Sequence, residues 1–421
     1  MSELLPKHNP YEALQVKEFR YFLAMRFCIT LAIQIQSVVV GWLVYQITDS
    51  KLLLGTIGLT EVIPSIAFSF LAGHVVDKVH RKRIIVMATS ALVLCSVLLW
   101  LYTFDYSRGL FGNQVYPIFI VIFITGIARS FLGPGMFAFM PQLVGKKQFQ
   151  NAVTWSSANW HIASVVGPAL GGLLYGFVGI QTTFFIQMSL VAVSLVFIAM
   201  VAAKPLPESV KANQAEGIGQ RLTEGLRFVW HNKIILNAIS LDMFAVLFGG
   251  AVALLPVFAN DILMIGPEGL GILRAAPAFG AVLMTFFLAR FPIRQHAGQK
   301  MLVAVAGFGV SIIGFGLSPW FGLSLFMLFL SGVFDSISVN VRSTLLQIHT
   351  PEHMKGRVSA VNNIFVGSSN ELGEFESGIT AHWFGTVPAV VFGGCMTLVV
   401  VSVTAAKAKV LRNLHLSTDN K

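Results

Sequence analysis

Long apolar runs separated by short polar segments dominate this chain. The runs are bounded by charged residues or by Gly and Pro clusters, and most reach the ~20 residues that a helix needs to cross a bilayer. They predict twelve transmembrane helices, at residues 20–45, 52–76, 84–104, 117–140, 153–178, 181–203, 234–258, 269–290, 301–317, 321–346, 357–383 and 387–406.

The longest connection, 204–233, divides these helices into two groups of six. Its last part has apolar residues on one helical face, which is typical of a surface helix. We therefore expect an N-terminal six-helix half at 1–203, a cytoplasmic linker with an amphipathic helix at 204–233, a C-terminal six-helix half at 234–406 and a cytoplasmic tail at 407–421.

The composition indicates an all-α membrane protein. Of the 421 residues, 55% are hydrophobic and only 11% are charged, and the mean hydropathy is +0.74. Soluble domains contain about 25% charged residues, and disordered chains are polar and rich in charge. A soluble enzyme and a disordered chain are therefore excluded.

The positive charge of the chain predicts its orientation. The formal net charge is +10, and most of the 29 Lys and Arg residues fall in alternate loops when the N-terminus is placed in the cytoplasm. Cytoplasmic loops of membrane proteins are enriched in Lys and Arg. We expect both termini in the cytoplasm and the lipid bilayer, rather than nucleic acid, as the partner of this charge.

Patterns in one half recur weakly in the other. Gly58-x-x-Glu61-x-x-Pro64 corresponds to Gly271-x-x-Arg274-x-x-Pro277, and Gly126-x-x-Arg129 corresponds to Gly332-x-x-Asp335. The sign of the charge is exchanged in both pairs. Parallel six-helix repeats are typical of transporters whose substrate site lies between the halves near the bilayer midplane.

Several motifs resemble those of the major facilitator superfamily. The loop Gly73-x-x-x-Asp77-Lys78-x-x-Arg81-Lys82-Arg83 resembles its signature between spans 2 and 3, although His80 stands where Gly is usual. Gly167-Pro168-x-x-Gly171-Gly172 resembles the fifth-span motif of exporters that exchange substrate for protons, with Ala163 replacing the leading Gly. Gly41-Trp42-x-x-Tyr45-x-x-Thr48 and the stretch 369–378 are similar to the drug:proton antiporter-3 branch, which contains the enterobactin exporter and macrolide efflux proteins.

The resemblance covers nearly the whole chain and implies roles for two motifs. The loop latches the outward-facing state in the family, so the expected cytoplasmic latch is Gly73, Asp77, Lys78, Arg81 and Lys82. Anchoring on the cytoplasmic side would explain the cations of this loop but not Asp77. The bend in span 5 seals the interface in the family, which implies that role for Gly167, Pro168, Gly171 and Gly172. Helix packing and bending alone is the alternative.

Ionisable residues inside the predicted spans are the strongest functional signal. A charge at the bilayer centre costs at least ~2.5 kcal/mol, so each such residue marks a candidate site. We expect Arg129 and Asp335 to act in coupling or in recognition of substrate charge, with structural pairing alone as the alternative. Polar stripes on spans 1 and 10, together with a span-7 acid, provide the candidate cavity or substrate residues, which are Arg26, Thr30, Gln34, Ser37, Asp242 and Ser338. Pairing near the cytoplasmic helix ends is the alternative for Asp242 and Arg342.

Span 11 is unusually polar. Glu371 and Glu374 are one helical turn apart, so burial and mutual repulsion both favour the protonated carboxyl group. We expect Glu61, Glu371 and Glu374 to carry protons, with Glu61 of span 2 as the partner of the two span-11 acids from the other half. The alternative is a polar contact that only holds spans 2 and 11 together.

The sequence contains no metal-ligand spacing, no ATP-binding phosphate loop and no catalytic set, so we expect neither a cofactor nor an enzyme. It predicts a monomeric secondary transporter that exports a siderophore or drug-like small molecule in exchange for protons, across a bacterial inner membrane, by alternating access. An uptake carrier or a lysophospholipid flippase on the same fold is the alternative. A membrane receptor or enzyme is the alternative of another class.

Overall fold

The computed structural model describes residues 11–104, 114–145, 148–205, 218–291, 293, 295–351 and 354–412, and its regular elements there are helices. We use the name N-half for the first group, which consists of η1 (Ala13–Gln15), α1 (Lys17–Thr48), α2 (Lys51–Lys78), α3 (Arg81–Tyr102), α5 (Tyr116–Leu143) and α6 (Phe149–Ala199). The connecting helix is α8 (Ile218–His231).

We use the name C-half for the elements that follow α8. They are α9 (Lys233–Phe248), η2 (Ala251–Leu254), α10 (Leu255–Val257), η3 (Phe258–Ile262), α11 (Gly266–Arg290), α12 (Ala297–Gly316), α13 (Phe321–His349), α14 (Lys355–Phe384), α15 (Thr386–Lys407) and α16 (Lys409–Arg412).

The predicted spans are all present as helices. Among the described residues, ten segments are long and apolar enough to cross a membrane, and one of them, Asn151–Ala199, contains two predicted spans. The backbone of Gly179 separates these two, because its φ of 78° and ψ of 169° interrupt the helical path. The remaining span, α14, is not among the ten segments, which agrees with the polarity of its sequence. The all-helical membrane fold is therefore confirmed.

The seventh predicted span, 234–258, differs from a continuous helix. The helix α9 ends at Phe248, and the chain continues through η2 and α10 into the π-helix η3. Two adjacent glycines, Gly249 and Gly250, follow α9 directly, and Pro256 lacks a backbone donor. Glycine and proline are the residues that break a helix most readily. After this break, the last turns of the span contact the N-half, where α10 packs against α1 and η3 is hydrogen-bonded to α1.

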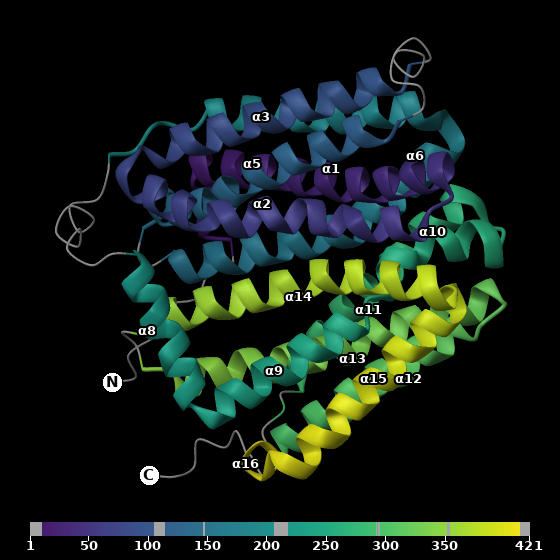
Figure 1. Cartoon of the computed structure of the whole chain (residues 1–421). Coiled ribbons are helices and arrows are strands. Elements are labelled where there is room, and N and C mark those ends of the chain that lie inside the picture. The colour runs from purple at the N-terminus through teal and green to yellow at the C-terminus, as the bar shows by residue number, and fades with distance from the viewer. Residues whose placement is uncertain are drawn as a thin grey trace.

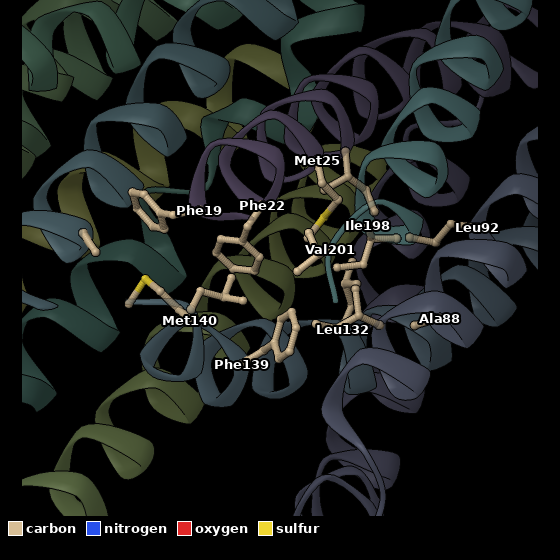
Figure 2. Packing of buried hydrophobic residues seen from close by; sticks show 14 of the residues in the cluster. Phe19, Phe22, Met25, Ala88, Leu92, Leu132, Phe139, Met140, Ile198 and Val201 are labelled. Atoms are coloured by element: carbon tan, nitrogen blue, oxygen red, sulfur yellow. The ribbon is translucent and has the colours of Figure 1, made fainter. Parts of the chain in front are cut away.

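The helices α8 and α16 lie at one end of the bundle, which we name the α8 end; α10 lies at the opposite, far end (Figure 1). The α8 end of the N-half has a packed apolar core. Figure 2 shows Phe19, Phe22 and Phe139 together with aliphatic side chains from α3, α5 and α6. At the same end, an ion pair between Glu224 and Arg357 fixes α8 to α14.

The two halves meet along two helix pairs, α2 with α14 and α6 with α11. Figure 1 shows α14 lying beside α2 between the halves. Towards the far end, a Cβ built on Gly55 would lie 2.7 Å from the Cα of Gly378, and one on Gly172 would lie 2.5 Å from the Cα of Gly271. Only residues without a side chain permit such close approach of two backbones.

Inside the C-half, α11 and α13 approach each other just as closely at Gly332. A Cβ on Gly332 would overlap the carbonyl oxygen of Pro277. We expect Gly332→Ala to lower the free energy of unfolding by about 1–3 kcal/mol, as overpacking does. The measurement is thermal unfolding of the purified protein in detergent. Gly133→Ala on α5 is the matched control, because nothing lies within 4 Å of its added Cβ. Equal unfolding temperatures for both variants would contradict this packing.

Candidate functional site

A cavity of about 320 Å³ lies between α2, α5 and α14, where the two halves meet. Its lining includes three charged residues that the sequence singled out, Glu61, Arg129 and Glu371. Glu61 and Arg129 form an ion pair within the N-half, and their side chains are 22% and 37% exposed. Exposure of this degree means that the pair borders the cavity and is not enclosed in a helix contact.

Two of the three acids of α14, Glu371 and Glu374, lie against the backbone of α2. A Cβ on Gly58 would lie 2.9 Å from Oε2 of Glu374 and 3.1 Å from Oε2 of Glu371. Glycine at this position therefore makes room for both carboxylates at the seam between the halves. Glu61 lines the same cavity as Glu371, and its direct partner is Arg129. Both carboxylates interact with the Arg129 guanidinium at longer range.

A second guanidinium enters this region from α11. Arg274 donates from Nη2 to Oγ of Ser37 at 2.8 Å and from Nη1 to the Ser37 carbonyl at 3.3 Å, so it links the C-half to α1. Its charge also acts on Glu371 and Glu374. Arg274 was not among the site residues expected from the sequence. The signal was present in its correspondence with Glu61 in the internal repeat.

A separate polar cluster lies within the C-half, between α9 and α13. Asp242 forms an ion pair with Arg342 and accepts a hydrogen bond of 3.2 Å from Oγ of Ser338. Asp242 is 3% exposed and Arg342 is 4% exposed. Asp335 interacts electrostatically with both, and among the described residues it has no hydrogen bond or ion pair. The structure thus places Asp335 with this cluster, away from the Glu61–Arg129 pair.

The polar stripe of α1 faces different partners along its length. Arg26 donates to Oγ of Ser156 on α6, while Ser37 binds Arg274. Gln34 packs against Gly167, where a Cβ would lie 2.5 Å from the Cβ of Gln34. Thr30 is half-buried on the same helix. The stripe therefore contacts α6 at two places before it reaches the other half.

The predicted bend motif lies where α6 meets both α1 and α11. Gly171 packs against Ile35 of α1, and a Cβ there would lie 3.1 Å from the Cα of Ile35. On the other side, a Cβ on Gly271 would lie 2.9 Å from the carbonyl oxygen of Pro168 and 2.8 Å from the Cα of Gly172. These contacts give the motif a packing role at the seam, and sealing remains a prediction.

The predicted latch is only partly visible. The side chain of Asp77 and the surroundings of Gly73 lie outside the described residues. Lys78 ends α2 and is exposed, and Arg81 begins α3 and is buried. Lys82 donates from Nζ to the carbonyl of Ala199 at 2.9 Å, which is a contact within the N-half. A cross-half role for this loop stays a prediction.

At the far end, a hydrogen bond joins the two halves directly. Tyr45 of α1 donates from its hydroxyl to Oδ2 of Asp261 on η3. Tyr45 is 3% exposed, whereas Asp261 is exposed. Tyr45 belongs to a family-specific stretch of the sequence. Asp261 was not among the expected site residues, because the broken backbone that presents it was not foreseen.

Comparison with known proteins supports this architecture. A profile of the family described as "Transmembrane secretion effector" matches residues 8–418. The multidrug efflux pump Tap of Mycolicibacterium fortuitum is 23% identical over 386 residues, which cover 90% of this chain and 92% of Tap. The enterobactin exporter EntS of Shigella boydii serotype 4 (strain Sb227) is 23% identical over 350 residues, which cover 82% of this chain and 80% of EntS.

Solved transporter structures share the fold at low sequence identity. A bacterial homolog of the human lysosomal transporter Spinster, in an inward-facing and occupied conformation, has a TM-score of 0.73 at 12% identity, covering 97% of this chain and 100% of its own. The nucleoside transporter NupG has a TM-score of 0.70 at 14% identity, covering 93% and 99%. The chain therefore belongs to the transmembrane secretion effector family and is a multi-pass secondary transporter of the major facilitator superfamily.

Proposed function

We propose that this protein exports a siderophore or drug-like small molecule across a bacterial inner membrane in exchange for protons. The observation that carries the proposal is the charged seam between α2 and α14, where Glu371 and Glu374 face Gly58 beside the Glu61–Arg129 pair. Ionisable groups at membrane depth mark ion and substrate pathways. Because this seam joins the halves, a change of charge on it alters how strongly the halves hold together.

A proton suits this seam as the coupling ion, because the seam has more carboxylates than guanidiniums. Three carboxylates, of Glu61, Glu371 and Glu374, lie near two guanidiniums, of Arg129 and Arg274. One carboxylate therefore remains without a compensating charge in this group, and adding a proton neutralises it. Loss of that proton restores the unbalanced charge, which is costly inside a bilayer. The protonation state can thereby select between conformations.

The direction of transport is supported by the relatives. Tap is named a multidrug efflux pump and EntS an enterobactin exporter. The Lys and Arg distribution supports a cytoplasmic α8 end, where Arg227 and Lys233 flank the junction of α8 and α9. With this orientation, the substrate binds from the α8 end and leaves at the far end.

Alternating access is supported by the way in which the far end is held together. The contacts Gly55–Gly378 and Gly172–Gly271, the Tyr45–Asp261 hydrogen bond and the Arg274–Ser37 hydrogen bonds all join opposite halves there. A substrate can leave at that end only after these contacts separate. We propose that the structure represents the state that is closed at the far end.

A lysophospholipid flippase is the second candidate, and one observation favours it. A crevice of about 570 Å³ lies between α6, α11 and α13, and its lining is entirely apolar, with Val166, Phe279 and Phe326 exposed along it. A crevice of this kind suits an acyl chain. Translocation of fluorescent lysophospholipid into inverted vesicles, without accumulation of any siderophore or drug, would favour this candidate. Transport in the opposite direction would identify an uptake carrier.

Glu374 of α14 and Asp335 of α13 are acids that the proposed function requires for proton movement. We expect Glu374→Gln or Asp335→Asn to abolish proton-driven accumulation of substrate in inverted membrane vesicles, because the amide cannot bind and release a proton. A panel of siderophores and drugs that are toxic to, or retained by, a deletion strain supplies the substrate. Protein level and unfolding temperature are measured in parallel as controls. If transport in both variants keeps the pH dependence of the wild type, these residues are not proton carriers.

The Tyr45–Asp261 hydrogen bond is one of the contacts that close the far end in the proposed mechanism. We expect Tyr45→Phe to open it more often, because the charge-assisted bond to Asp261 contributes about 1.5–3 kcal/mol, or roughly tenfold or more in population. Leu54, buried beside Tyr45, is changed to Cys in a background without the native cysteines. The measurement is its rate of labelling by a membrane-impermeant thiol reagent.

Tyr175→Phe is the matched control for this experiment. Tyr175 donates to Oε1 of Gln46 within the N-half, so this variant removes the same hydroxyl group without touching the Tyr45–Asp261 hydrogen bond. We expect labelling in this control to stay at the rate of the parent. Faster labelling in both variants, or in neither, would remove Tyr45–Asp261 as a closing contact.

A further inference from the structure

The cavity between α2, α5 and α14 contains one carboxylate more than it has cations. Its lining holds Glu61, Glu371 and Arg129 as charged residues. The Arg129 guanidinium is engaged by Glu61. The Glu371 carboxylate has neither an ion pair nor a hydrogen bond to any of the described residues. The lining therefore carries a charge of −1 when Glu371 is ionised, and that charge belongs to the unpaired group.

The charged groups around Glu371 do not supply the missing partner. Arg274 makes its hydrogen bonds to Ser37 of α1 and reaches Glu371 only through its field. Glu374 lies one helical turn further along α14, beside the same Gly58, and adds a second negative charge. A positively charged group that enters the cavity is attracted by this arrangement, and an anion is repelled.

The remaining lining residues indicate the size and polarity of the ligand that the cavity can hold. Val62 and Ile66 of α2 and Ile364 of α14 form aliphatic walls, and Ser65 and Ser368 add hydroxyl groups. A volume of about 320 Å³ is within the usual range of small-molecule sites, towards its lower end. The cavity thus accommodates a compact amphiphile, or the charged end of a larger one, with its polar group near Glu371.

We propose that this cavity binds the protonated amine of an amphiphilic organic cation on the Glu371 carboxylate, in competition with the proton. This inference rests on the proposed function and narrows its substrate from any siderophore or drug-like compound to a cation. An anionic ligand would need Arg129 to leave Glu61. Taking Arg129 away from Glu61 would leave the Glu61 carboxylate without its partner at membrane depth, where an unpaired charge is costly.

Because the cation and the proton compete for the Glu371 carboxylate, movement of the cation in one direction is coupled to movement of a proton in the other. When the cation binds from the α8 end, Glu371 releases its proton to that side and forms an ion pair with the ammonium group. After the halves reorient, a proton from the far side binds the carboxylate as the cation departs. Each cycle moves one monovalent cation outward and one proton inward, so no net charge crosses the membrane.

The test uses three isosteric probes and the full-length protein in lipid nanodiscs. Phenylbutylammonium, phenylbutanol and phenylbutyrate share one apolar body and differ in the charge of the polar group. We expect the ammonium probe to bind roughly tenfold or more tightly than the alcohol, and the carboxylate probe to bind weakest. Calorimetry measures the affinities. A pH indicator in weak buffer is expected to report one proton released per ammonium bound.

Variants assign this binding to Glu371. We expect Glu371→Gln to lower affinity for the ammonium probe by roughly tenfold or more and to remove proton release, with phenylbutanol affinity unchanged. Glu376→Gln is the matched control, because it is the same substitution on the same helix and Glu376 does not line the cavity. Gly367→Val is the second variant. Gly367 lines the cavity, and nothing lies within 4 Å of a Cβ built on it, so the valine side chain would occupy cavity space. This variant should block binding of all three probes.

The outcomes separate this inference from the proposed function. Equal binding of the ammonium and carboxylate probes, or full affinity in Glu371→Gln, would overturn cation recognition at Glu371. Export of another substrate by inverted vesicles would then still support the proposed function. Conversely, cation binding with proton release in nanodiscs, but no accumulation in vesicles under a pH gradient, would support the site and refute export.

Discussion

The cost of an unpaired charge in the hydrocarbon layer governs the arrangement of this protein. Each ionised side chain at membrane depth needs a partner on another helix or a place beside a polar cavity. The Asp242–Arg342 pair meets this requirement inside the C-half, and the Glu61–Arg129 pair meets it inside the N-half. The acids of α14 have no such pair among the described residues, so this helix lies between the halves, next to α2, α8 and α9.

The seam between the halves combines close packing with this unbalanced charge. Towards the far end, glycine pairs bring α2 against α14 and α6 against α11, so the backbones themselves are in contact. Near the middle of the same seam, Gly58 leaves room for Glu371 and Glu374. A change in the charge of these acids acts directly on the surface along which the halves must move. This coincidence of packing and charge gives a physical basis for coupling proton movement to reorientation.

The cluster around Asp242 and Arg342 and the cluster at the cavity have different roles. Asp242 and Arg342 are almost fully buried and have direct partners, which favours a structural role within the C-half. Asp335 lies beside them, and its carboxylate has no hydrogen bond or ion pair among the described residues. The cavity cluster is more exposed and includes residues from both halves, which favours ligand binding there. The repeat that linked Arg129 with Asp335 therefore relates two positions whose surroundings differ.

Local features of the sequence were enough to determine the helices, except for the break after Phe248 in the seventh span. Apolar runs of membrane-spanning length predicted each span, and the polar residues of α8 and α14 did not prevent their recognition, because both keep a helical pattern. Partners were decided only by the tertiary structure. Glu61 binds Arg129, Arg274 binds Ser37 and Tyr45 binds Asp261, and each of these contacts joins helices far apart along the chain. The hydrophobic pattern states which residues lie in the membrane, but the rotation and spacing of packed helices decide which of them meet.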